Sequence, residues 1–211
     1  MTGGHNTGRL VGVFALQGDV AEHVRVLTAL GARVRPLRSA ADLTGLDGLV
    51  IPGGESSVMD KLSRLLGVAP ALREAIAAGL PVYGTCAGMI MLADSIANPI
   101  AGQRSFGGLD ISVQRNAFGS QVESFETALE VPEVSGDPVH AVFIRAPAVL
   151  RAGPDVRVLA SVPASRLENP DHPAGDVPVA VRQGRLLATS FHPEVTGDWS
   201  FHRYFLEHVI R

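Results

Sequence analysis

The chain has 211 residues, a formal net charge of −3 at pH 7, a hydrophobic share of 46% and a charged share of 18%. This composition excludes an intrinsically disordered chain, and the slight negative balance predicts neither nucleic acid nor an anionic membrane as a partner. No apolar run approaches the roughly 18 residues that span a bilayer, and the first residues lack a signal-peptide pattern, so we expect a cytoplasmic protein.

The N-terminal half alternates short apolar runs with helical patterns. Residues 1–8 are small, polar and glycine-rich, and we expect them to form a disordered extension before a single domain over residues 9–211. Strands are predicted at 10–16, 34–37, 48–51 and 81–84, and helices at 20–30, 57–66, 69–78 and 87–96. The alternation predicts an α/β fold with a doubly wound, mainly parallel sheet flanked by helices.

Beyond residue 108 the pattern changes to strands without intervening helices. Strands are predicted at 109–113, 123–131, 140–144, 156–162, 177–181 and 186–190. They predict an antiparallel extension of the parallel sheet, closed by a helix at 199–210. Loops are predicted at 98–108 and at 166–176, the latter rich in Pro, Asp and Gly.

Cys86 is the single cysteine of the sequence, which excludes an intramolecular disulfide and a cysteine-based zinc site. It lies between a predicted strand and a predicted helix, in the sequence GTCAG (84–88). A nucleophile in this setting sits on a tight turn, and the backbone N–H of Ala87 at the start of the helix can face a developing negative charge. Cys86 is therefore a candidate nucleophile; the alternative is a small buried core cysteine.

His192 and Glu194 are the candidate partners of the cysteine. They follow a predicted buried strand, and Pro193 favours an extended backbone in which both side chains project to the same side. The carboxylate would hold the imidazole in one tautomer while the other ring nitrogen faces the thiol. Ligands gather at the C-terminal ends of strands in open α/β sheets, so we expect both residues near Cys86; the alternative is a surface turn.

Two glycines after the third strand form the third candidate feature. An amide of Gly53 or Gly54 can approach a substrate closely and complete an oxyanion hole with Ala87. The alternative is a helix-capping turn with Ser56 or Ser57 as the cap. The histidines show no metal-ligand spacing, and neither a metal nor a cofactor is expected. His23, near the end of the first strand, is singled out among the other histidines.

Together these motifs resemble the class I glutamine amidotransferases. Within that class the sequence is similar to the PdxT/SNO family, the glutaminase subunits of pyridoxal 5′-phosphate synthase. The matching segments are VFALQGDVAEH (13–23), PGGESS (52–57), GTCAGMIMLA (84–93), RNAFGSQVESFE (115–126), FIRAP (143–147) and SFHPEVTGD (190–198). The resemblance implies the flavodoxin-like fold of that class.

The resemblance also implies an activity, the hydrolysis of L-glutamine to L-glutamate and ammonia. Cys86 would be the nucleophile that forms a glutamyl thioester, His192 the general base and then acid, and Glu194 the orienting carboxylate. Gly54 and Ala87 would form the oxyanion hole. The implied glutamine-binding residues are Gly54, Glu55, Ser56, Arg115, Ile144 and Arg145. An α-ammonium group favours a carboxylate such as Glu55, and an α-carboxylate favours the guanidinium of Arg115 or Arg145.

The implied partner is a synthase subunit that uses the ammonia to build pyridoxal 5′-phosphate, in an assembly of up to twelve synthase and twelve glutaminase subunits. We expect weak activity until the synthase docks, with the Gly53-Gly54 turn as the switch. Ser120, where many relatives carry a basic residue, and the long segment 166–176 depart from the family pattern. The alternatives are a glutaminase for another amidotransferase, or a cysteine-dependent α/β peptidase or redox sensor.

Overall fold

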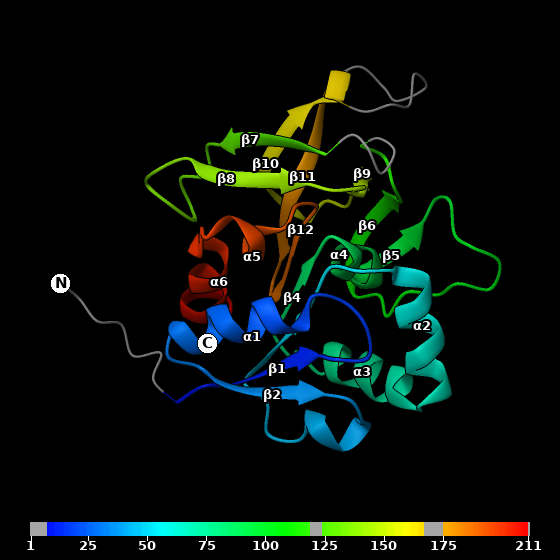
Figure 1. Ribbon diagram of the computed structural model, residues 1–211. Coiled ribbons are helices and arrows are strands. Elements are labelled where there is room, and N and C mark those ends of the chain that lie inside the picture. Colours follow the sequence, from blue (N-terminus) through cyan, green and yellow to red (C-terminus); the bar gives the residue numbers. More distant parts are fainter. Residues whose placement is uncertain (1–7, 119–123, 167–174, 211) are drawn as a thin grey trace.

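A computed structural model describes residues 8–118, 124–166 and 175–210 (Figure 1). The seven strands of its main sheet are β1 (Leu10–Phe14), β2 (Arg33–Leu37), β3 (Gly48–Ile51), β4 (Val82–Thr85), β10 (Arg157–Pro163), β11 (Asp176–Gln183) and β12 (Leu186–Thr189). The helices are α1 (Val20–Ala29), α2 (Ser56–Leu65), α3 (Val68–Ala77), α4 (Ala87–Leu92), α5 (Pro193–Thr196) and α6 (Ser200–Tyr204), with short helical turns η1 (Ala40–Leu43), η2 (Ala164–Arg166) and η3 (Phe205–Val209).

The main sheet has the strand order β10-β11-β12-β4-β3-β1-β2. All neighbours from β12 to β2 pair in parallel, whereas β11 is antiparallel to β12 and β10 is antiparallel to β11. Both the doubly wound parallel sheet and its antiparallel extension are therefore confirmed. Because β4 lies between β3 and β12, the loops that follow these three strands emerge at one edge of the sheet.

Helices cover both faces of this sheet, and the alternation of side chains along each strand decides which core each residue joins. In β3, Leu49 and Ile51 pack in the core beneath α2, α3 and α4. Val50, between them, packs in the other core, beneath α1, α6 and η3. All four residues of β3 are buried, as a strand covered on both faces requires.

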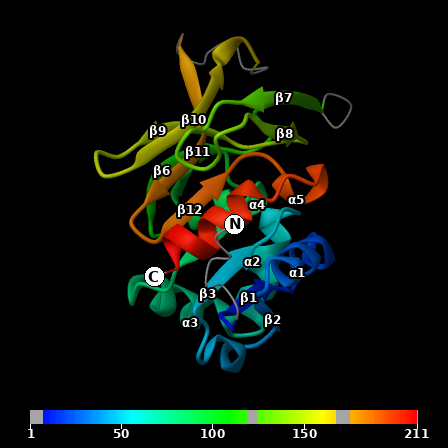
Figure 2. The same ribbon diagram turned by 90° about the vertical axis from the view of Figure 1, so that its left-hand side faces the viewer.

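Two smaller sheets stand beside the main one. β5 (Ala93–Ile96), β6 (Leu109–Gln114) and β9 (Ala148–Ala152) form one, and β7 (Phe125–Leu129) and β8 (Val139–Phe143) form the other. The β7–β8 hairpin lies above α5 in Figures 1 and 2. The backbone N–H of His192 donates to the carbonyl of Val142 in β8 at 3.0 Å, so this hairpin fixes the segment that carries the candidate base.

Three predictions along the chain are wrong. The helix predicted at 87–96 ends at Leu92, and 93–96 form β5, which pairs in parallel with β6. No strand was predicted where β9 lies. The strands of the two smaller sheets were expected to extend the main sheet, but they form separate sheets. In each case pairing with a distant strand outweighs local preference. The described residues do not include 1–7, Ser120 or 167–174. Most of the predicted N-terminal extension (1–8) and of the predicted loop (166–176) therefore lies outside them.

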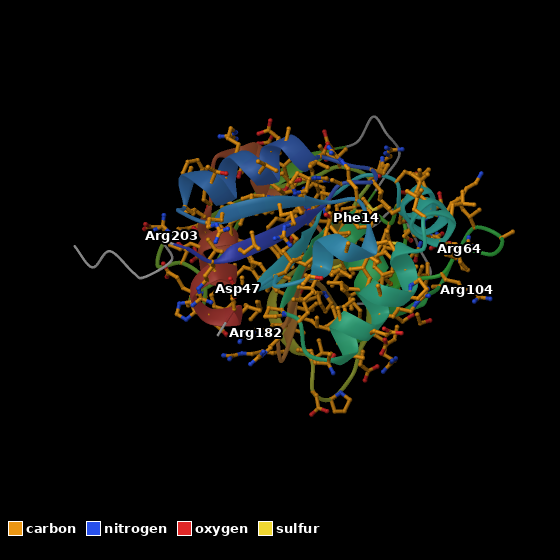
Figure 3. All side chains as sticks on the ribbon, turned by 90° about the horizontal axis from the view of Figure 1, so that it is seen from below. Phe14, Asp47, Arg64, Arg104, Arg182 and Arg203 are labelled. Carbon is orange, nitrogen blue, oxygen red and sulfur yellow. The ribbon has the colours of Figure 1, made fainter. Side chains whose placement is uncertain are left out.

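The loop before β6 is held to α2 by Asp60, whose side chain is buried. Its carboxylate accepts two hydrogen bonds from Arg64, at 2.9 and 3.0 Å, and a third from the backbone N–H of Arg104 at 3.1 Å. Figure 3 shows Arg64 and Arg104 near one another at the periphery, while Phe14 lies in the interior. This anchor fixes the loop that contains Gln103.

No helix in the described ranges 8–118, 124–166 and 175–210 is both long and apolar enough to cross a membrane.

The turn around Cys86 depends on two glycines. A Cβ atom on Gly88 would lie 2.1 Å from the carbonyl oxygen of Ile51, and one on Gly84 would lie 2.5 Å from the carbonyl carbon of Gly88. Backbone cannot yield as a flexible side chain can, so β3, β4 and α4 pack this closely only with glycine at both positions.

We expect Gly88→Ala to lower the free energy of unfolding by at least about 2 kcal/mol, since overpacked cores lose 1–3 kcal/mol or more. Denaturant unfolding followed by circular dichroism measures this. Gly136→Ala is the matched control, because no atom lies within 4 Å of a Cβ at Gly136. Equal stability of the two variants would contradict the close packing.

Candidate active site

A pocket of about 350 Å³ opens at the edge of the sheet where β3, β4 and β12 end. Of the predicted site residues, it is lined by Gly54, Glu55, Ser56, Cys86, Ala87, Arg115, Ile144, Arg145 and His192. Glu194 lies behind His192 and has no exposed surface. The fold thus brings together residues from five separate segments of the chain, all predicted from the sequence.

Cys86 occupies the turn between β4 and α4. Its φ of 48° and ψ of −104° are unusual for a residue with a side chain, and its N–H donates to the carbonyl of Thr189 in β12 at 2.8 Å. The residue is 6% exposed, and its surface faces the pocket. A strained backbone of this kind is typical of functional turns, as the nucleophile hypothesis predicts.

His192 and Glu194 form a buried pair. Nδ1 of His192 lies 2.7 Å from Oε1 of Glu194, so the second ring nitrogen is free to face Cys86. The predicted contact is present, but the extended backbone is not: Pro193 is the first residue of helix α5, with His192 as its N-cap. Proline fits the first turn of a helix because its missing N–H has no partner there, and this explains the error.

The surroundings of His192 favour its protonated form. Burial lowers its pKa, but hydrogen bonding to Cys86 and to Glu194, together with the charges of both, outweighs burial and raises the pKa to about 10. The imidazole is therefore protonated at neutral pH when it faces the thiolate form of Cys86. An imidazolium in this position can give its proton to a leaving amine.

A charged pair also lines the pocket. Nη2 of Arg115 lies 3.0 Å from Oε1 of Glu55, and Nη1 donates to Oε1 of Gln103 at 3.1 Å. Gln103 in turn donates to Oγ of Ser56 at 2.9 Å. Arg115 is 8% exposed, so this network fixes a cation beside a carboxylate at the pocket wall.

The segment Gly53–Glu55 is packed against the end of β1. Gly54 has a φ of +147°, a conformation that residues with a Cβ rarely adopt. The carbonyl of Gly53 accepts from the N–H of Asp19 at 3.2 Å, and the N–H of Glu55 donates to Oε1 of Gln17 at 2.9 Å. The segment also caps helix α2, but the predicted cap residues Ser56 and Ser57 are wrong: the N-cap is Glu55, whose side chain accepts from the N–H of Ser57.

Backbone strain is concentrated at this pocket. Cys86, Asn116 and Arg145 have positive φ values of 48°, 51° and 46°, and within the described residues they are the non-glycine residues with this conformation. All three line the pocket. Strained residues of this kind are held by the surrounding structure and cluster at functional sites.

Comparison with known proteins identifies the family. Residues 13–211 match the model of the SNO glutamine amidotransferase family. The chain belongs to this family.

Close relatives of this SNO glutamine amidotransferase carry one name. A protein of Clavibacter michiganensis subsp. michiganensis, named pyridoxal 5′-phosphate synthase subunit PdxT, is 62% identical over 97% of this chain and 93% of its own length. A protein of the same name from Leifsonia xyli subsp. xyli is 60% identical over 94% and 95%. The resemblance inferred from the sequence is confirmed.

Solved structures agree with this assignment. A crystal structure of a glutamine amidotransferase is 46% identical, covers 93% of the SNO glutamine amidotransferase chain and 97% of its own, and superimposes with a TM-score of 0.81. A structure of a putative GMP synthase subunit from Thermoplasma acidophilum, at 19% identity and a TM-score of 0.61, shares the fold. The predicted fold class is therefore confirmed.

Several residues at the site of this SNO glutamine amidotransferase were not predicted. Gln103 supports Arg115 and Ser56, and Gln17 supports Glu55. No motif marks Gln103, and Gln17 lies in the matching segment 13–23 without a predicted role. Asp19 and Asn116 line the pocket as well. Asp19, the residue before helix α1 in the loop that follows the first strand, had a positional signal, because the loops after strands face the ligand in this fold.

The structure also contains a group of potential metal ligands. Asp19, His192 and Glu194 each offer a ligand atom, and within the described residues these three atoms lie within 4.8 Å of one another. Nδ1 of His192 is engaged with Glu194 at 2.7 Å and lies 3.9 Å from Oδ2 of Asp19. The short contact is that of a hydrogen-bonded histidine–carboxylate pair.

Proposed function

We propose that the chain is the glutaminase subunit of a pyridoxal 5′-phosphate synthase, which hydrolyses L-glutamine to L-glutamate and ammonia. The observation that carries the proposal is that Cys86 and His192, the latter paired with Glu194, line one pocket together with the ion pair of Glu55 and Arg115. The names of the relatives supply the pathway. Residues 9–211 would act as a single glutaminase domain, in the cytoplasm, without a metal or another cofactor.

The pocket has polar groups for both ends of glutamine. In the proposed complex the α-ammonium meets Glu55 and the α-carboxylate meets Arg115, two side chains that pair with each other at 3.0 Å in the free chain. Ser56, Ile144 and Arg145 complete the binding residues. The side-chain amide then reaches Cys86, where the N–H groups of Gly54 and Ala87 are proposed to stabilise the oxyanion.

The reaction proceeds in two halves. The Cys86 thiolate attacks the amide carbon, and the resulting tetrahedral intermediate collapses to a glutamyl thioester as His192 gives its proton to the departing ammonia. His192 then removes a proton from water, which attacks the thioester carbon. The C–S bond breaks, and glutamate and the Cys86 thiol are released. Glu194 holds the imidazole in place throughout.

The same family assignment suggests regulation by a partner. The ammonia would pass to a synthase subunit, in an assembly of up to twelve copies of each subunit. Docking would adjust the Gly53-Gly54 turn, whose contacts with Gln17 and Asp19 connect it to the end of β1. A weak free glutaminase would prevent the loss of glutamine when no acceptor is present.

Release of glutamate and ammonia from L-glutamine, by the purified chain alone and with a pyridoxal 5′-phosphate synthase subunit, tests this function. We expect equal amounts of both products and a rate at least about tenfold higher with the partner, about 1.4 kcal/mol in the barrier. L-Asparagine, one methylene shorter, is the control substrate. A rate independent of the synthase would assign the glutaminase to another amidotransferase, and no hydrolysis in either mixture would favour a peptidase or redox sensor.

A further inference from the structure

Two buried histidines lie on the side of Glu194 that faces away from the pocket. His23 in α1 and His202 in α6 have no exposed surface, and Nδ1 of His23 lies 2.9 Å from Nε2 of His202. α1 and α6 cover the same face of the main sheet (Figure 1). Nε2 of His23 lies 3.2 Å from Oγ1 of Thr85 and 3.7 Å from Oε2 of Glu194. The proposed mechanism uses neither histidine.

Both rings are neutral. Burial first, and then the nearby His202 and His192, hold the pKa of His23 well below its usual value. Burial lowers the pKa of His202 to about 3, with the charge of Asp198 opposing the shift. A neutral imidazole has one N–H donor and one acceptor nitrogen, so the two rings can share their hydrogen bond in only two ways.

The surroundings favour one of these arrangements. If His23 donated through Nδ1, its Nε2 lone pair would face the Glu194 carboxylate, and His202 would bury an N–H at Nδ1, which has no partner in the described parts of the chain. If His202 donates through Nε2, the Nε2–H of His23 faces Thr85 and Glu194, and only an acceptor is left unpaired. Unpaired buried donors are the rarer case in folded proteins.

Glu194 needs such a donor. Its side chain is fully buried, Oε1 is engaged with His192 at 2.7 Å, and Oε2 makes no hydrogen bond to any residue that the structure describes. A buried carboxylate without compensating dipoles is costly. At 3.7 Å the His23 N–H is too distant for a hydrogen bond, but it acts on Oε2 as a dipole in a medium that screens little.

We propose that His23 is a positioning residue of the glutaminase: its Nε2–H faces Oε2 of Glu194 and orients the carboxylate toward His192, while His202 holds His23 in this tautomer. The inference rests on the proposed function, since Glu194 is taken as the orienting residue of the triad. Loss of the groups that orient metal ligands from behind typically costs about 10- to 100-fold in affinity or activity, and we expect an effect of this size at Glu194.

The first test is the tautomer itself. Nuclear magnetic resonance of the full chain with ¹⁵N-labelled histidine, at pH 7, distinguishes a proton on Nε2 from one on Nδ1. We expect both His23 and His202 to carry it on Nε2. A proton on Nδ1 of His23 would overturn the proposal. This result does not depend on glutamine hydrolysis, so it separates a failure of this inference from a failure of the proposed function.

The second test compares two substitutions of one residue. The amide nitrogen of glutamine reproduces the position of a histidine Nε2–H, whereas leucine offers no donor. We expect His23→Leu to lower kcat about 10- to 100-fold with KM within about twofold, and His23→Gln to keep kcat within about threefold of the wild type. His208→Gln, at a half-exposed histidine away from the pocket, is the control.

A merely structural role predicts a different pattern. It would make both His23 variants lose activity in proportion to their loss of thermal stability, and it would leave the pH at which His192 titrates unchanged. We expect that titration to occur at lower pH in His23→Leu than in His23→Gln. Equal kcat values for these two variants at equal stability would contradict the proposal, and the tautomer measurement decides it even if His23→Leu does not fold.

Discussion

Replacement of Cys86 by alanine is expected to abolish glutamine hydrolysis, with kcat falling by about 10⁴-fold or more, because the nucleophile is lost. The side chain is small and 6% exposed, so the melting temperature is expected to stay within a few degrees of the wild type. Coupled glutamate detection and differential scanning calorimetry measure the two effects. Residual hydrolysis within tenfold of the wild type would show that Cys86 is not the nucleophile.

A second variant separates the chemistry of Cys86 from its backbone conformation. The φ of 48° at Cys86 is unfavourable for any residue with a Cβ, and such strain costs of order 1–3 kcal/mol. We therefore expect Cys86→Gly to be as inactive as Cys86→Ala but to melt at a higher temperature, because glycine adopts this conformation without strain. A lower melting temperature for Cys86→Gly would mean that the turn stores no strain.

Replacement of Glu194 by glutamine is expected to lower kcat about 10³-fold at neutral pH with little change in KM. The amide keeps the shape of the side chain but removes the charge that orients and stabilises the imidazolium of His192, 2.7 Å away. Steady-state kinetics with L-glutamine measure this loss. A change confined to KM would contradict the orienting role.

The same variant has a defined pH dependence. His192 has a pKa raised to about 10, so the stability from its charged form is fully present below pH 6.5 and is lost as the pH rises through about 10. In Glu194→Gln we expect the pKa of His192 to fall, because burial persists and the carboxylate is gone. Its titration, followed by nuclear magnetic resonance, should shift to lower pH. Glu74→Gln, on the exposed face of α3, is the control and should leave the titration unchanged.

Local sequence patterns predicted the structure correctly where tertiary packing favours the same conformation as the local sequence. The buried strand at 48–51 and the GTCAG turn at 84–88 were predicted correctly, since an apolar run and paired glycines leave few alternatives. The prediction failed where pairing with a strand distant in the chain decides the conformation. Residues 93–96 continue a helical pattern but pair with β6. The error at Pro193 has a local cause instead, because proline also fits the first turn of a helix.

The candidate site divides in the same way. Cys86, His192 and Glu194 have side chains whose chemistry is evident from sequence and motif alone. The roles of Gln103 and Gln17 became visible only in the structure, because Gln103 acts through hydrogen bonds to Arg115 and Ser56, and Gln17 through one to Glu55. His23 was singled out for its place near a strand end, but its contacts with Thr85, His202 and Glu194 could not be read from that position.

The sequence by itself determined the fold class and the family and predicted the candidate reactive residues, because each of these is encoded in hydrophobic periodicity or in short motifs with fixed side-chain chemistry. The tertiary structure alone decided which residues support them: the strained backbone of Arg145 and Asn116, the Gln103 bridge, and the two neutral histidines behind Glu194. Such contacts join segments that are distant in the chain, and their energies depend on distances and burial that exist only after folding.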